Sequence, residues 1–379
     1  MLQLIRRQSA GMKNPVYASF ALAFASFGDA FLYPFLPQYG GKMGIPIVWI
    51  GFLLAVNRFI RIAFNPMVPR LFAKFGIHQV TIAASLLAVV STFGYGLNWG
   101  LFSFALFRIV WGLSFSILRT STLAYALEHS KQGKAMGIGK SIQEIGPMIA
   151  LWIGPLLLSV CSVSHVFFAL AALSIPSLIF SLRLSGGEES PIAITKPLFS
   201  LPSLLNTMTF IVSFIAEGVI VVTAGQILTK AGKSYSMAEI TAIAAVYLAY
   251  RRLCSVLLSP IAGAIADRVG FKTIFNGSAA IIVLGLIFVL SGLRAIGFLF
   301  IFAFNSVNSA MAPGGVATNA ADKIKAISVN ATWRDTGVAV GTLTGGLLLT
   351  GTFLYETILI TTFILTILLS IVYAKNQTR

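Results

Sequence analysis

Two segments of the chain align without a gap: AMGIGKSIQEIGPMIALWIGPLLL at residues 135–158 and AISVNATWRDTGVAVGTLTGGLLL at residues 326–349. Residues that are scarce in apolar helices coincide in this alignment: Glu144 with Asp335, Gly146 with Gly337, and Gly154 with Gly345. Two further segments, which contain residues 58–76 and 252–270, also align. The coincident or similar residues there are Arg58 with Arg252, Pro66 with Pro260, Lys74 with Arg268, and Gly76 with Gly270. An internal repeat therefore relates the two halves of the chain.

The composition is that of an integral membrane protein. Hydrophobic residues make up 57% of the chain and charged residues 10%, whereas soluble domains carry roughly 25% charged residues. The net charge of +16 is scattered over short loops and apolar stretches, without a basic arm, so we exclude a nucleic-acid partner. Two cysteines in apolar segments and three scattered histidines give no metal-ligand spacing, so no cofactor or metal is expected.

The hydrophobic stretches predict twelve transmembrane spans. Each is long enough for the roughly 20 apolar residues that cross a bilayer, and a chain in lipid satisfies its backbone as helices. The predicted fold is an all-α membrane protein whose 12 helices form two pseudo-symmetric six-helix bundles. The spans lie near residues 15–39, 46–69, 77–98, 100–126, 135–160, 163–184, 203–229, 237–263, 271–292, 296–319, 326–350 and 352–374.

The loop charges predict the orientation. One side of the predicted membrane carries fifteen Lys and Arg residues and the other four, so the positive-inside rule places both termini in the cytoplasm. Residues 1–184 are the predicted N-terminal bundle, 185–202 a cytoplasmic linker, and 203–379 the C-terminal bundle. The short loops favour a bacterial inner-membrane protein, which we expect to act as a monomer.

Several motifs resemble those of the major facilitator superfamily. GAIADRVGFK at residues 263–272 resembles its loop signature, and Arg108 with Gly112 matches its fourth-span signature. GDAFLYPFLP at residues 28–37 is similar to a first-span pattern of drug:proton antiporters, and Gly146-Pro147 loosely resembles their fifth-span signature. The resemblance implies a twelve-helix transporter whose two parallel halves rock around a midplane substrate site.

The loop signature suggests gating residues. The candidates are Gly263, Asp267, Arg268, Gly270 and Lys272. In the superfamily this Asp caps a neighbouring helix and pairs with basic residues when the cytoplasmic side is closed. The first-half copy, PRLFAKFGIH, has Ala73 instead, so that half is expected to lack the latch. The alternative is a tight helical turn for which Gly270 supplies the backbone freedom.

Twelve charged residues lie in the middle of the predicted spans. A charged side chain at the centre of a span costs at least about 2.5 kcal/mol, so such residues face partners or an aqueous cavity. The acids are Asp29, Glu144, Glu217 and Asp335, and the bases are Arg58, Arg61, Arg108, Arg119, Lys140, Arg251, Arg252 and Arg334. If all ionise, the bases exceed the acids by four.

This excess favours an anionic or zwitterionic substrate, because guanidinium groups bind carboxylate or phosphate in a bidentate manner. Arg58 and Arg61 share one helix face. The candidate substrate-binding residues are Arg58, Arg61, Arg252 and Arg334. Alternatively, the arginines pair with the acids and only hold helices together. Lys140 and Arg119 can instead extend towards the cytoplasmic interface.

Asp29 is the first candidate for proton coupling. A buried carboxyl whose environment alternates between apolar surroundings and a nearby Arg takes up and releases a proton. Arg108 is the expected partner, and Glu217 is the corresponding acid of the second half. A static Asp29–Arg108 ion pair is the alternative. We interpret Glu144 and Asp335 as local ties, because Lys140 precedes Glu144 by four residues and Arg334 adjoins Asp335.

Three functions remain compatible with the sequence. The first is a proton-coupled exporter of a small molecule, which the antiporter-like first span favours. The second is an uptake symporter or exchanger for an organic anion. The third is a membrane enzyme or lipid-handling protein, although we find no nucleophile elbow, metal-ligand cluster or paired catalytic carboxylates. The expected partners are a small-molecule substrate, protons and the lipid bilayer.

Overall fold

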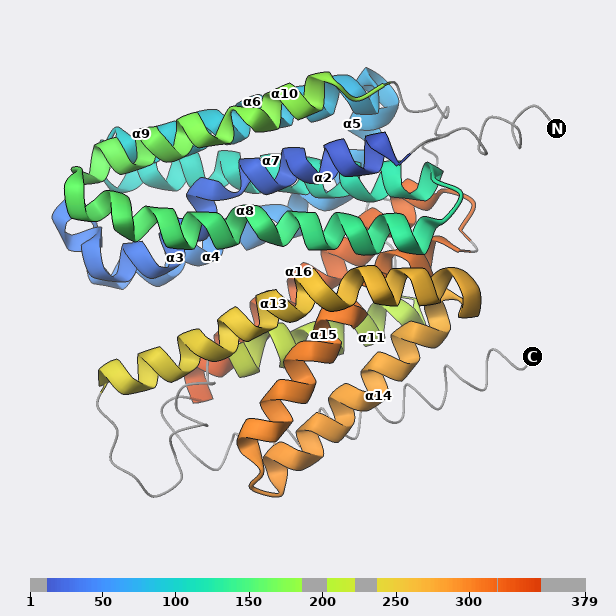
Figure 1. Ribbon diagram of the computed structural model, residues 1–379. Helices are drawn as coiled ribbons and strands as arrows, with labels where there is room; N and C mark the ends of the chain where they lie inside the picture. Colours follow the sequence, from blue (N-terminus) through green and yellow to red (C-terminus); the bar gives the residue numbers. More distant parts are fainter. Residues whose placement is uncertain (1–11, 186–202, 222–236, 319, 349–379) are drawn as a thin grey trace.

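The computed structural model describes residues 12–185, 203–221, 237–318 and 320–348, and the chain in these ranges is almost entirely helical. The first half contains α2 (Lys13–Ala25), α3 (Phe27–Tyr39), η1 (Gly40–Met43), α4 (Ile47–Phe64), η2 (Asn65–Met67), α5 (Val68–Phe75), α6 (Ile77–Gly96), α7 (Leu101–Glu128), α8 (Gln132–Val160), α9 (Val163–Ser174) and α10 (Pro176–Leu182). The second half contains α11 (Leu204–Ser213), η3 (Phe214–Val219), α13 (Met237–Val269), α14 (Phe271–Leu290), α15 (Arg294–Ala317) and α16 (Lys323–Leu348). Figure 1 shows the halves as two bundles lying side by side.

Some predicted spans consist of two or more helices. The first span bends between α2 and α3, where the Ser26 hydroxyl donates to the carbonyl of Leu22 at 2.7 Å, a bond that often bends helices. The sixth span is interrupted before Pro176, which begins α10. In the seventh span Glu217 lies on a π-helical turn, η3, a distortion frequent at functional sites.

Within the described residues, seven helical segments are long and apolar enough to cross a membrane. They are Lys13–Leu32, Ile77–Gly96, Leu101–Glu128, Gln132–Leu158, Val163–Leu182, Phe271–Leu290 and Arg294–Ala317. The apolar helix Leu204–Val219 is shorter. The predicted span at 352–374 lies outside the described residues, so the count of twelve stays a prediction.

Equivalent glycines of the two halves have equivalent structural roles. Gly76 and Gly270 precede α6 and α14 with φ of 79° and 90°, a conformation that glycine adopts without strain. Gly146 packs against a backbone carbonyl of α2, and Gly337 against one of α11. A side chain at either position would collide with that carbonyl, so these glycines let helices approach closely.

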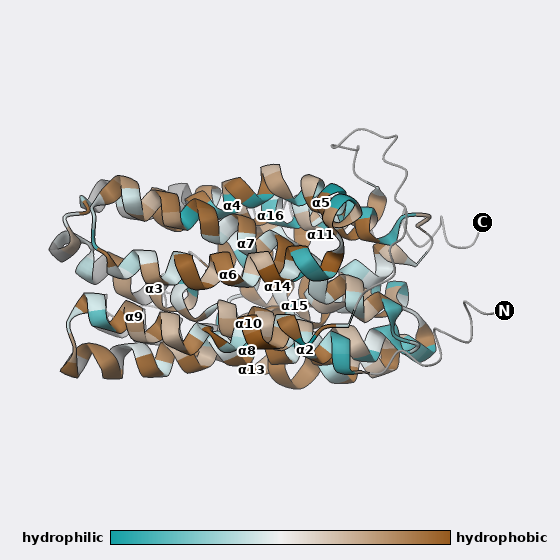
Figure 2. Cartoon of the chain, turned by 90° about the horizontal axis from the view of Figure 1, so that it is seen from above, coloured by the Kyte–Doolittle hydropathy of each residue, from teal (hydrophilic) through white to brown (hydrophobic). Residues whose placement is uncertain are grey.

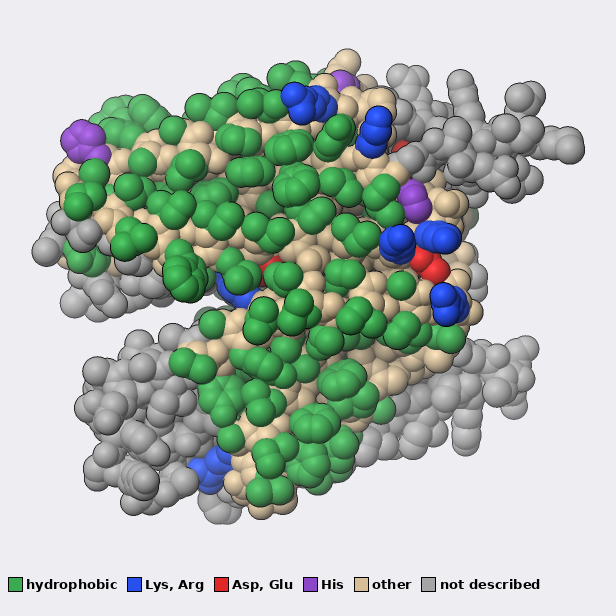
Figure 3. Space-filling view, in the orientation of Figure 1, with side chains coloured by type: hydrophobic (Ala, Val, Ile, Leu, Met, Phe, Trp, Pro, Cys, Tyr) green, Lys and Arg blue, Asp and Glu red, His purple; other side chains and the backbone are tan. Residues whose placement is uncertain are grey.

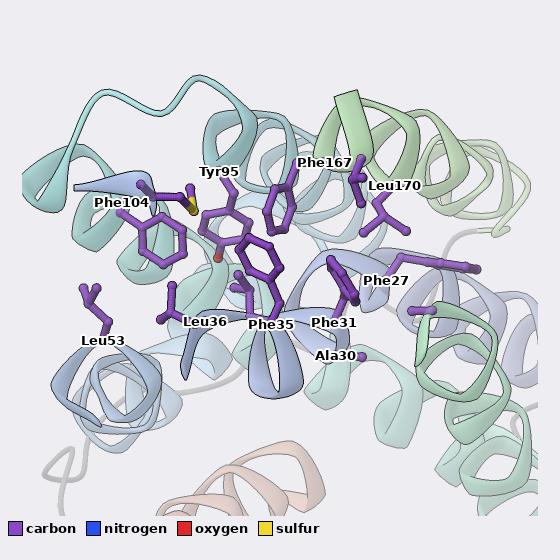
Figure 4. Packing of buried hydrophobic residues seen from close by; sticks show 14 of the residues in the cluster. Phe27, Ala30, Phe31, Phe35, Leu36, Leu53, Tyr95, Phe104, Phe167 and Leu170 are labelled. Carbon is purple, nitrogen blue, oxygen red and sulfur yellow. The ribbon is translucent and has the colours of Figure 1, made fainter. Parts of the chain in front are cut away.

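Each half has its own apolar core. In the first half an aromatic cluster joins α3 to α6 and α9 (Figure 4). The rings of Phe35 and Phe167 meet edge to face with centroids 5.2 Å apart, and Tyr95 lies beside them. The core of the second half packs η3 against α14 and α15. Many large apolar side chains lie on the outer surface instead, as a lipid-facing surface requires (Figure 3).

The halves meet closely at one end of the molecule, where α8 begins and α13 ends, and we call it the closed end. A small apolar cluster there includes Leu127 and Met136 of the first half and Ala317 and Ile327 of the second. Hydrophilic residues are concentrated near this end (Figure 2). Towards the opposite end the halves diverge and leave a cleft, seen on the left of Figure 3.

Candidate substrate and coupling site between the two halves

Helices α8 and α13 form one side of the contact between the halves. They run antiparallel, and Gly137 of α8 lies against the backbone of Ser259. One turn further along α8, the Ser141 hydroxyl donates to the carbonyl of Val256 at 2.7 Å. This close approach depends on small side chains, because a Cβ on Gly137 would collide with the Ser259 carbonyl.

Helices α4 and α16 form the other side of the contact and are the repeat equivalents of α13 and α8. Arg61 of α4 forms an ion pair with Asp335 of α16 at 2.6 Å. Asn65 donates to the second oxygen of the same carboxylate at 3.1 Å. One turn away, Arg58 donates to the Thr342 hydroxyl at 3.5 Å. The contact between the halves is therefore polar here, at a depth where each charge needs a partner.

Glu144 and Asp335 each join the two halves, which goes beyond the local ties expected from the sequence. The Lys140–Glu144 tie is present at 2.7 Å, but Glu144 also pairs with Arg252 of the other half at 2.8 Å. For Asp335 the neighbouring Arg334 lies 3.8 Å away, farther than Arg61. Spacing along one helix revealed only the partner on that helix.

Glu217 anchors a second cluster within the C-terminal half. Its carboxylate lies 2.5 Å from Arg334 and 3.5 Å from Arg251. Asn305 of α15 donates to its other oxygen at 3.4 Å. The Glu217 side chain is 5% exposed. Arg334 lies near both Glu217 and Asp335, so these two acids belong to one network.

Asp29 and Arg108 form an ion pair inside the first half, as expected from the sequence. Asn57 donates to the same oxygen of Asp29 at 3.4 Å. Arg108 is fully buried and also donates to the carbonyls of Leu53 and Leu54 in α4, at 3.0 and 3.2 Å. A change in the charge of Asp29 would therefore act on the segment of α4 that leads to Arg58.

The ion pairs leave an excess of positive charge at the interface. Among the described residues, seven of the eight bases lie within ion-pair distance of an acid. Arg58 is the eighth, and its hydrogen bond to Thr342 is neutral on the acceptor side. With the Asp29–Arg108 pair set aside, seven bases face three acids, which is a formal excess of four. A solute with negative charge would compensate part of it.

At the closed end, Asp267 of α13 caps the N-terminus of α8. Its carboxylate accepts hydrogen bonds from the backbone N–H groups of Gly133 and Lys134, at 2.7 and 2.9 Å. These N–H groups have no partner within the helix, and the helix dipole favours a negative charge there. Gly263 lies against the backbone of Gly133. Arg268 is exposed near the turn at Gly270, and Lys272 lies in the first turn of α14.

Two residues of the site were missed in the sequence. The sequence left open whether Arg119 extends towards the membrane interface, but its side chain is 13% exposed and lies 3.7 Å from Asp335. That alternative is ruled out for Arg119, because the interior acid attracts the guanidinium inward. Asn65, which binds Asp335, was also unrecognised. Its position four residues after Arg61, on the same helix face, was an available signal.

The fold and the charged interface define a membrane transport protein with two pseudo-symmetric helical halves. The chain belongs to the major facilitator superfamily, whose family model matches residues 18–209, just over half of its length. It is therefore a secondary transporter and not an enzyme. No protein with a curated description matches it.

Solved structures show the same fold at low identity. The proton:xylose symporter XylE, bound to 6-bromo-6-deoxy-D-glucose, is 12% identical with a TM-score of 0.70; the match covers 96% of this chain and 95% of XylE. The human organic anion transporter MFSD10 (TETRAN) is 14% identical with a TM-score of 0.67, and the match covers 93% of this chain and 99% of MFSD10. These matches establish an all-α membrane protein of the superfamily fold.

Proposed function

We propose that the protein exports a small organic anion, zwitterion or drug-like molecule by alternating access, with a proton as the coupling ion. The observation that carries this proposal is the set of ion pairs that bridge the halves at Glu144 and Asp335. These pairs separate when the closed end opens, so their arginines are available to a solute in one conformation and not in the other. The proposed substrate ligands are Arg58, Arg61, Arg252 and Arg334.

The direction of opening follows from the loop charges. The positive-inside rule assigns the closed end, with both termini and the 185–202 linker, to the cytoplasm. The described conformation then has its cytoplasmic side shut and its cleft towards the outside. Such a conformation is the one from which an exporter releases its substrate. The bundles 1–184 and 203–379 are the proposed moving bodies, in a bacterial inner membrane.

Asp29 is the proposed proton carrier, with Arg108 as its charge partner. Arg108 also binds carbonyls of α4, the helix that carries Arg58 and Arg61. Protonation of Asp29 therefore removes the ion pair of Arg108 and loosens its hold on this helix. Proton binding and solute binding then act on the same helix. Glu217 is the second candidate carrier. Asp267 and the turn around it are the proposed cytoplasmic gate.

An uptake symporter or exchanger for an organic anion is the second candidate. The formal excess of four bases at the interface favours it, because anion exchange needs positive charge in the cavity but no proton carrier. The two solved relatives are described as acting on different classes of solute, a sugar and organic anions. The fold therefore does not determine the substrate, and the residues of the site do.

The two candidates differ in their response to a pH gradient. Purified protein in liposomes with an internal pH-sensitive dye should dissipate an imposed gradient when a transported anion, zwitterion or cationic drug is added. Asp29→Asn should abolish this proton flux and retain substrate binding, while Arg70→Gln, at an exposed position of α5, should behave as wild type. Substrate accumulation that ignores the gradient would refute proton coupling and favour exchange. Wild-type proton flux in Asp29→Asn would move the carrier to Glu217.

A further inference from the structure

Three guanidinium groups from three helices converge on one carboxylate. Arg61 of α4 lies 2.6 Å from Asp335, Arg119 of α7 lies 3.7 Å away, and Arg334 of α16 lies 3.8 Å away. Asp335 itself is 1% exposed. We call Arg61, Arg119 and Arg334 the guanidinium cage. Two of its members come from the first half of the chain and one from the second.

The cage contains more hydrogen-bond donors than its acid can accept. Each guanidinium carries five N–H donors, and a carboxylate has about four acceptor positions. One oxygen of Asp335 accepts from Arg61 and the other from Asn65. Buried N–H groups on all three arginines have no hydrogen-bond partner within the described residues: Arg61 Nε, Arg119 Nη1 and Arg334 Nε. Because an unpaired buried donor is costly, such a cluster indicates a missing acceptor.

The cage is buried but not sealed. The side chains of Arg61, Arg119 and Arg334 are 11, 13 and 14% exposed. Arg58 has no acid within ion-pair distance among the described residues. It lies one turn before Arg61 on the same face of α4, farther from the closed end. A solute that enters the cleft therefore meets Arg58 before it reaches the cage.

We propose that the guanidinium cage binds an oxyanion group of the transported solute with two negative charges, such as a dicarboxylate or a phosphate. This inference rests on the proposed transport function and adds Arg119 to the ligands. Asp335 is the internal carboxylate that the solute displaces from part of the cage. A doubly charged group matches the local balance. The three cage arginines and Arg251 face the two carboxylates of Asp335 and Glu217, which leaves a formal excess of two positive charges. Planar guanidinium forks suit carboxylate and phosphate oxygens.

A purely structural cage predicts different behaviour. If the three arginines only hold α4, α7 and α16 together, removing one lowers the thermal stability and adds no anion response. If they bind a solute, Asp335 competes with it for the same donors. Neutralising Asp335 then tightens anion binding, a gain that a structural role does not produce.

The test is calorimetric titration of purified wild-type protein with inorganic phosphate, malonate and acetate at constant ionic strength. Phosphate and malonate should bind more tightly than acetate. Arg119→Gln should weaken their binding by at least about 30-fold, and Asp335→Asn should tighten it by about tenfold. Arg119→Lys, which keeps the charge but not the fork, should give an intermediate affinity and serves if the Gln variant does not fold. Arg70→Gln is the matched loss of an exposed arginine and should change nothing.

Two outcomes would overturn the cage. One is equal affinity for acetate, malonate and phosphate, or no binding of any of them. The other is wild-type affinity in both Arg119 variants. Phosphate binding without malonate binding, or the reverse, identifies which oxyanion the cage accepts. If no anion binds but a neutral or cationic compound drives proton flux in liposomes, the proposed anion binding by the cage is refuted and the proposed transport function is retained.

Discussion

Replacing Asp267 by Asn should loosen the closed end without unfolding the protein. The carboxylate of Asp267 accepts two backbone hydrogen bonds from the first turn of α8, at 2.7 and 2.9 Å. Asn keeps the size of the side chain and one acceptor oxygen, but loses the charge and the second acceptor. The residue is exposed and contacts no apolar core, so insertion and folding should be retained.

The size of the effect follows from these two bonds. Loss of a helix cap costs about 1 kcal/mol, and a charge near a helix N-terminus contributes roughly 0.3–1 kcal/mol at an exposed position. The sum is about 1–2 kcal/mol, and a difference of that size changes a two-state ratio about 5–30-fold. Conformations with an open cytoplasmic side should become more populated by this factor.

Spin-label distance measurements can detect the shift. Labels at Ser130 and Thr273, which are exposed on opposite halves at the closed end, report their separation. The free cysteines, Cys161 and Cys254, are first replaced by serine. In Asp267→Asn the distance distribution should gain a longer component and the transport rate should fall.

Asp322 provides a matched control, because it also caps a helix but does so within its own segment. Its carboxylate accepts from the backbone N–H of Lys325 at 2.9 Å. Asp322→Asn removes a cap of the same kind without removing a bond between the halves, so the distances should stay as in wild type. Identical distributions in the two variants would show that Asp267 stabilises only its local helix end, and would refute its gating role.

Two further predictions concern contacts between the halves. Arg58→Lys and Arg252→Lys each keep the charge but lose the guanidinium fork, so each change should weaken substrate binding. The effects of the double variant should not be additive, because the two arginines bind one ligand. Lower thermal stability with unchanged affinity would assign both arginines a structural role. Gly137→Leu should force α8 away from α13 and hold the closed end apart. Gly277→Leu is the control and should not, because a side chain at Gly277 points into open space. Equal spin-label distances in the two leucine variants would contradict the packing role of Gly137.

Sequence features that act along one helix or within one half were predictable. The Asp29–Arg108 pair followed from the depth of two charges on helices that pack in this family, and it is present. The Lys140–Glu144 tie followed from a spacing of four residues. The turn at Gly270, which was the alternative interpretation to gating, is present with positive φ, and its repeat equivalent Gly76 adopts a similar conformation.

Contacts between the halves were not predictable from the sequence. The repeat aligns Arg58 with Arg252, yet Arg252 pairs with Glu144 while the partner of Asp335 is Arg61, one turn from Arg58. The register of α4 on α16 decides which arginine reaches the acid, and it results from packing along the whole interface. No local spacing contains that information, which is also why the sequence left the position of the Arg119 side chain open.

The repeat explains why α16 does not need a capping acid at Ala73, the position of the first half that is equivalent to Asp267. Lys134 and Lys325 are equivalent residues, and each donates its backbone N–H to a carboxylate near the start of its helix. For Lys134 the carboxylate is Asp267 of the other half; for Lys325 it is Asp322 of the same segment. The position equivalent to Asp322 in the first half is Lys131, which cannot cap α8. Helices α8 and α16 thus have one capping acid each, and of the two only the acid that caps α8 comes from the opposite half. Among the described residues, Asp267 alone therefore caps a helix across the closed end, whereas the ion pairs deeper in the interface occur on both sides of the contact.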